Sequence, residues 1–231
     1  MVFDRNPSIQ SFDFAADFVE YLQRGDAPAT MLIVCSTRDA FLQQICASAS
    51  IAPTEPGDEQ PPHSSRDDNE SNMHTCSSRR FYNTIGLIAQ SNRVTLAFCP
   101  SLEHFRAYIS SFCRHRLMSL KQDDDDLHYG GGPLLAILGL LALHYDTREF
   151  SAQGIGKNLA LTVEVAARES VNLTLCECIV VGREYASGGS LWEADVPLLS
   201  GQARGTTGGE NAHTGRSVKV KQVAQRWFYF M

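Results

Sequence analysis

Two apolar runs separated by one long helical pattern constrain the fold of this chain most. The first run spans residues 134–143 and the second spans residues 173–181, and neither alternates strictly between apolar and polar side chains. Strands without such alternation are buried on both faces, which is typical of a parallel sheet. Because residues 151–172 between the runs favour a helix, we predict a buried strand–helix–strand unit. The first run is too short for a membrane span, which needs about 20 apolar residues.

Further strand and helix patterns flank this unit on both sides. They predict strands at residues 31–35, 93–99, 217–223 and 226–230, and helices at residues 11–24, 38–49, 79–92 and 102–117. Strands alternate with helices early in the chain, and strands follow one another at its end. We therefore predict an α/β fold: a mainly parallel sheet flanked by helices, extended by a C-terminal antiparallel hairpin.

The length and composition favour one domain over residues 1–231. The hydrophobic content of 43% is ordinary for a globular chain, and the net charge of −6 excludes a global basic field that would attract nucleic acid. Residues 51–79 are rich in Pro, Ser, Asp and Glu, so we expect a disordered insertion there. Residues 119–132, with four consecutive aspartates and several glycines, favour a solvated linker loop over a cation site.

The seven cysteines are scattered, and no Cys-x-x-Cys pair occurs. Most lie in apolar runs, which is typical of reduced, buried thiols in a cytosolic or nuclear protein. Cys176 and Cys178 share one face of a predicted strand, but further ligands at a useful spacing are missing, so we expect no metal site. No secretory signal precedes the domain, since residues 1–10 contain no apolar core.

Sequence motifs of nucleotide binding and of catalysis are missing. The turn at residues 35–39, between a predicted strand and a predicted helix, has no glycine and no Gly-Lys-Ser/Thr. Residues 154–158 (Gly-Ile-Gly-Lys-Asn) lack the required first glycine and the metal-binding hydroxyl, so we interpret them as the first turn of a helix. Gly-x-Ser-x-Gly, His-Glu-x-x-His and paired-carboxylate sites do not occur. We therefore expect no cofactor, no catalytic residue and no enzymatic activity.

The unit opening at residue 134 resembles the second half of the RecA-type recombinase core, in the form found in eukaryotic recombinases and their paralogues. In that family a helix opens with a Ser-Ala-Arg-Gln-like motif, and here it opens Ser151-Ala152-Gln153. The Leu191-Trp192-Glu193 segment with residues 217–223 resembles the C-terminal hairpin of recombinase paralogues. The resemblance covers about half the chain and implies a RecA-like core.

Two nucleotide-binding elements of the family are missing from this sequence. The family's magnesium-binding aspartate falls near Leu138, where an apolar side chain cannot hold the metal's water shell. With the phosphate loop also missing, the chain is similar to a RecA-fold subunit without ATPase motifs. The resemblance is to Shu-type complex subunits of the fungal kind, which pair with other recombinase-paralogue subunits in a heterodimer or larger complex, bind DNA and assist recombinase loading in homologous recombination. It implies location in the nucleus, with the cytoplasm as a second option.

Two alternatives stay open. One is an ATPase-dead RecA-like scaffold subunit of an Elongator-type tRNA-modification complex, and the other is a pure protein-interaction scaffold. No membrane contact is expected under any of these readings. Under the DNA reading, two loops that follow strands carry an arginine and a tyrosine each, which suit phosphate contact and base stacking. The candidate DNA-binding residues are Tyr145, Arg148, Lys157, Arg183, Tyr185, Arg204, Arg216, Lys219 and Lys221.

Overall fold

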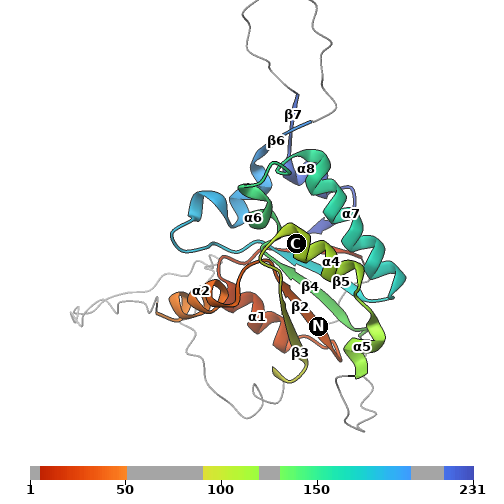
Figure 1. The fold of residues 1–231 in the computed structure, drawn as a ribbon. Coiled ribbons are helices and arrows are strands. Elements are labelled where there is room, and N and C mark those ends of the chain that lie inside the picture. Colours follow the sequence, from red (N-terminus) through yellow and green to blue (C-terminus); the bar gives the residue numbers. More distant parts are fainter. Residues whose placement is uncertain (1–5, 51–90, 120–130, 199–215) are drawn as a thin grey trace, which may run out of the picture.

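A six-stranded, wholly parallel sheet forms the centre of the molecule (Figure 1). The computed structural model describes residues 6–50, 91–119, 131–198 and 216–231. In spatial order the strands are β3 (Val94–Phe98), β2 (Thr30–Val34), β4 (Leu134–Leu138), β5 (Asn172–Cys176), β1 (Ser8–Gln10) and β8 (Tyr229–Phe230). The predicted α/β class and parallel sheet are confirmed.

The three central strands are buried along their whole length. Every residue of β2, β4 and β5 is buried, and the Cα register pairs Thr30 with Leu134 and Leu134 with Asn172. Helices cover both faces of the sheet, which explains why β2 and β4 are apolar almost throughout. In β5 the polar residues Asn172 and Thr174 are buried as well. The prediction of a buried strand–helix–strand unit is confirmed.

Helices cover the two faces of the sheet as two separate cores. On one face, α1 (Ala15–Arg24) and α2 (Arg38–Ser50) pack Phe18 and Phe41 against Leu32. On the other face, α4 (Leu102–Ser110) and α7 (Ala152–Arg168) pack Phe105 and Leu159 against the sheet. Figure 1 shows α1 and α2 together on one side and α7 on the other. The helices that connect strands toward β3 lie on one face of the sheet, and those that connect strands toward β8 lie on the other. Right-handed crossovers require this arrangement.

The predicted C-terminal antiparallel hairpin is present but shorter than the pattern indicated. It pairs β6 (Asp195–Pro197) with β7 (Ser217–Lys219) and stands apart from the main sheet. The strand predicted at residues 217–223 ends at Lys219, and α8 (Val220–Ala224) follows. Residues 217–220 alternate between polar and apolar side chains, and the predicted strand extended this alternation to residue 223. Val220, Val223 and Ala224 are instead buried with a helical spacing. Helix α8 packs on α7.

The first apolar run was wrongly predicted as one strand over residues 134–143. Strand β4 ends at Leu138, Gly139 turns the chain with φ +78°, and α6 (Leu140–Tyr145) follows. A left-handed φ suits glycine, which has no Cβ to clash. Periodicity alone cannot separate a buried strand from a buried helix when all residues are apolar. The turn places α6 directly beyond the carboxyl end of the sheet.

Other boundaries also differ from the patterns. The helix expected over residues 102–117 is two helices, α4 and α5 (Arg114–Ser119), and the strand expected to reach residue 181 ends at Cys176. The helix expected from residue 11 begins at Ala15. Residues 8–10 before it form β1, a strand too short to leave a periodic signal. The last strand, β8, lies at the sheet edge with Tyr229 exposed, so it is not the buried strand that was expected.

Three predicted segments fall mainly outside the described residues. These are the insertion at residues 51–79, the helix at 79–92 and the linker at 119–132, of which Ser119 belongs to α5. Two short 3₁₀ helices, Glu184–Ala186 (η1) and Gly189–Glu193 (η2), connect β5 to β6. Within the described ranges, no helix is long and apolar enough to cross a membrane.

Burial predicts different costs for two otherwise identical substitutions on the α1–α2 face. Leu22 on α1 is 2% exposed, whereas Leu42 on α2 is 45% exposed. We expect Leu22→Ala to lower the free energy of unfolding by about 2–5 kcal/mol, because it leaves a cavity in the core. The matched control Leu42→Ala should change it by about 0.5 kcal/mol or less. Urea denaturation measures both values, and equal losses would contradict this packing.

Candidate functional site

A crevice lies where the strand order of the sheet reverses. From β2 the chain crosses through α2 to β3, while from β4 it crosses through α6 and α7 to β5 on the other side. In open α/β sheets, ligands bind in the crevice outside the carboxyl ends of the strands at such a switch point. Here a cavity of about 320 Å³ opens between the ends of β2 and β4.

Apolar side chains form most of the crevice and polar groups lie at its sides. Val34 and Leu138, the last residues of β2 and β4, contribute apolar surface together with Val180. The polar lining comes from four places: the β2–α2 turn, α2 itself, the C-terminal end of α6 and the segment before η1. Its members include Ser36, Thr37, Gln44, Asp146 and Arg183. An apolar interior with a few polar groups is the usual composition of a ligand-binding pocket.

The two loops predicted from the sequence to contact DNA meet beside this crevice. The Arg183 guanidinium pairs with the Asp146 carboxylate across the two loops. The rings of Tyr145 and Tyr185 pack edge to face with centroids 6.2 Å apart. Tyr185 is 72% exposed, whereas Tyr145 is partly buried and also packs on Phe150 at 5.2 Å. The structure therefore brings together Tyr145, Arg183 and Tyr185.

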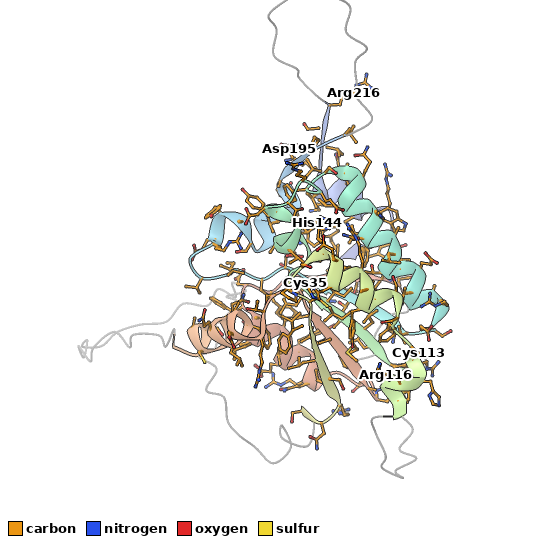
Figure 2. All side chains as sticks on the ribbon, in the orientation of Figure 1. Cys35, Cys113, Arg116, His144, Asp195 and Arg216 are labelled. Atoms are coloured by element: carbon orange, nitrogen blue, oxygen red, sulfur yellow. The ribbon has the colours of Figure 1, made fainter. Side chains whose placement is uncertain are left out.

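The remaining candidate residues are spread over other parts of the surface. Arg148 is exposed in the loop after α6, and Lys157 is exposed on α7. Arg216 is exposed at the start of β7, and Figure 2 shows it far from Cys35 at the crevice. Arg204 lies outside the described residues.

Glu193 engages Lys219 of the hairpin and Lys221 of α8. Lys219 Nζ donates to the Glu193 carbonyl oxygen at 2.8 Å, and Lys221 Nζ lies 3.6 Å from a Glu193 carboxylate oxygen. Lys221 also lies over the Phe230 ring, 5.1 Å from its centroid. These contacts tie both lysines to η2 and β8 and partly offset their charge.

A buried polar network, which sequence reasoning missed, holds α6 in place. His144 and Asn158 are both fully buried, and Asn158 Nδ2 donates to His144 Nε2 at 2.7 Å. His144 Nδ1 lies 3.3 Å from the Glu149 carbonyl oxygen, to which it can donate. Arg106 of α4 completes the network by donating to Asn158 Oδ1 at 2.9 Å and to the Glu149 carboxylate. Every partner fits a neutral imidazole with its proton on Nδ1.

The electrostatics of the network favour that neutral state. Burial lowers the pKa of His144 to about 4, and the hydrogen bond from Arg106 lowers the pKa of the Glu149 carboxyl. His144 lies on α6 and Asn158 on α7, so no local sequence pattern could have indicated their contact. The network joins α4, α6 and α7 and so positions Tyr145 and Asp146 at the crevice.

A buried carboxyl group directly after the neighbouring strand caps α6. Glu177, directly after β5, accepts hydrogen bonds from the backbone N–H groups of Leu141 at 2.7 Å and Ala142 at 3.3 Å. Burial raises the pKa of Glu177 to about 8, and these N–H groups act against that rise. Glu177 thereby satisfies backbone donors at the start of α6 that have no partner inside the helix.

The cysteines near the crevice are buried thiols. Burial strongly raises the pKa of Cys35, and it raises the pKa of Cys99 to about 11. The Cys176 and Cys178 sulfurs lie 3.5 Å apart, and that contact raises the pKa of Cys178. High pKa values disfavour the reactive thiolate. In the part of the chain that the structure covers, three or more potential metal ligands do not gather anywhere.

Among the described residues, the loops at the carboxyl edge do not form a glycine-rich phosphate loop. The β1–α1 and β2–α2 loops contain no glycine, and the turn between β4 and α6 contains Gly139 alone. Leu138 is buried at the end of β4. Residues 154–158 lie in the first turns of α7, as predicted, and the Gly154 N–H donates to the Ser151 hydroxyl. A Cβ on Gly154 would lie 2.2 Å from the Glu149 carbonyl oxygen, so this glycine permits close backbone contact.

No family model, curated protein or solved structure matches the chain.

The lowered pKa of His144 predicts a loss of stability in acid. An imidazole whose folded pKa lies below its unfolded value stabilises the fold above about pH 6.5, and this contribution is lost as the pH falls toward 4. We expect up to about 3 kcal/mol of the free energy of unfolding to depend on it. Urea denaturation at several pH values should show a smaller loss in His144→Gln, whose side chain does not titrate. Parallel pH curves for the two proteins would contradict the prediction.

Proposed function

We propose that the chain is a non-catalytic RecA-like subunit that binds DNA and assists recombinase loading in homologous recombination repair. In this proposal it works in the nucleus, within a heteromeric complex with other recombinase-paralogue subunits. One observation carries the DNA part: the loops after α6 and before η1 meet at the carboxyl edge, where Arg183 and Tyr185 are exposed.

The chemistry at this edge suits a single strand. Arg148 and Arg183 can contact phosphate, and the exposed Tyr185 ring offers a stacking surface for a base. The Arg183–Asp146 pair is exposed on both sides, so water screens it and it contributes about 1 kcal/mol or less. A phosphate can therefore compete with Asp146 for the guanidinium. The net charge of −6 provides no general attraction for DNA, so in this proposal DNA contacts only this local surface.

A scaffold without nucleic-acid contact is the second candidate. The pairing of Lys219 and Lys221 with Glu193 favours it, since these cations belonged to the predicted DNA-binding set. A ring subunit of an Elongator-type complex is one form of this alternative. Affinity purification followed by mass spectrometry distinguishes the candidates, because recombination proteins support the first and tRNA-modification proteins support the second.

Loss of the edge arginines should weaken single-strand binding. We expect Arg148→Ala with Arg183→Ala to lower the affinity for a fluorescent oligothymidine, and to reduce the salt slope of log K by about 1.4 for two lost phosphate contacts. Fluorescence anisotropy at several salt concentrations measures both quantities, with the purified partner present when one is found.

The matched control removes two arginines at the opposite edge of the sheet. Arg24 and Arg168 lie near the C-terminal ends of α1 and α7, are exposed and form ion pairs, as Arg183 does. The variant Arg24→Ala with Arg168→Ala should bind like the unaltered chain. Equal losses in both double variants, or no salt-sensitive binding at all, would overturn the DNA proposal.

A further inference from the structure

We propose that the crevice between β2 and β4 receives one unstacked base of a single strand bound at the carboxyl edge. This inference rests on the proposed DNA function and names the part of the ligand that the cavity takes. It predicts a preference for single strands over duplex, because bases inside a duplex are stacked and paired.

The size and lining of the crevice suit a flat, mainly apolar ring. Its volume of about 320 Å³ is at the small end of the range for ligand pockets, which is about 300–1,000 Å³. Val34, Leu138 and Val180 supply apolar surface for the faces of a ring. Phosphates and sugars would stay outside, because the interior offers them few polar partners.

Polar groups at the sides of the crevice can contact the edge of a base. The Gln44 side chain carries both a donor and an acceptor, and the Ser36 hydroxyl can act as either. Both residues come from α2 or the turn before it, opposite the α6 side of the cavity. A base lying between these sides would meet hydrogen-bonding groups at its rim and apolar atoms at its faces.

The position of the crevice links it to the surface proposed for the strand. Asp146 and Arg183 line the cavity and also form the ion pair that joins the two loops. A phosphate bound to Arg183 would therefore lie at the cavity wall. The base next to it can enter the cavity while the neighbouring base stays stacked on Tyr185. Arg183 and Tyr185 bind the strand, and the crevice adds an energy term that depends on the base.

The experiment compares an oligothymidine with the same strand carrying abasic sites at its central positions. The two strands share their phosphate charges, so fluorescence anisotropy isolates the contribution of the bases. We expect the abasic strand to bind about tenfold more weakly, since each base contact of this kind contributes about five- to a hundredfold. In Ala40→Phe, which fills the cavity from α2, the preference for the intact strand should shrink to the part that stacking on Tyr185 supplies.

Ala47→Phe is the matched control, because Ala47 lies on the same helix, is also partly exposed and does not line the cavity. It should keep the preference for the intact strand. If the unaltered chain binds both strands equally with salt-sensitive affinity, the base pocket is overturned while the proposed function stands. The same follows if Ala40→Phe, folded by circular dichroism, keeps the preference undiminished. If no single strand binds at all, both proposals fail.

Discussion

The pairing of β2 with β4 is the contact on which the rest of the structure depends. The two strands are distant in sequence, yet they pair in parallel from Thr30 with Leu134 to Val34 with Leu138. All ten residues are buried, and each large apolar side chain stabilises the fold by about 1.5–3 kcal/mol. After β2 the chain crosses toward β3, and after β4 it crosses toward β5 on the other side. The two connections therefore diverge from the carboxyl ends of β2 and β4. The crevice is a direct consequence of that pairing.

Two buried polar groups secure the element that borders the crevice. Helix α6 has only six residues, too few for stability on its own. Glu177 caps its first turn from β5, and His144 joins its last turn to Asn158 and Arg106. A buried polar group is costly unless it is hydrogen-bonded, and here each one has partners. The shape of the site thus depends on contacts among residues that are up to 52 positions apart.

Sequence patterns predicted the layers of the fold better than the ends of its elements. Strand β4 was recognisable because full burial removes polar alternation, as in residues 134–138, whereas β5 was recognisable although it keeps the buried polar residues Asn172 and Thr174. The turn at Gly139 was missed because an unbroken apolar run hides the change from strand to helix. Strand β1 was missed because three residues give no period. The meeting of Tyr145 with Tyr185 could not be predicted, since it depends on how far each loop extends beyond its strand.

The sequence by itself determined an α/β fold with a buried parallel sheet, and it determined that glycine-rich phosphate loops are missing. Composition and periodicity carry this information because they report burial and local backbone freedom. Only the tertiary structure decided which candidate residues share a surface. Arg183 and Tyr185 lie together beside the crevice, while Glu193 engages Lys219 of β7 and Lys221 of α8. Sheet order sets these distances, and sheet order arises from long-range pairing that no local pattern records.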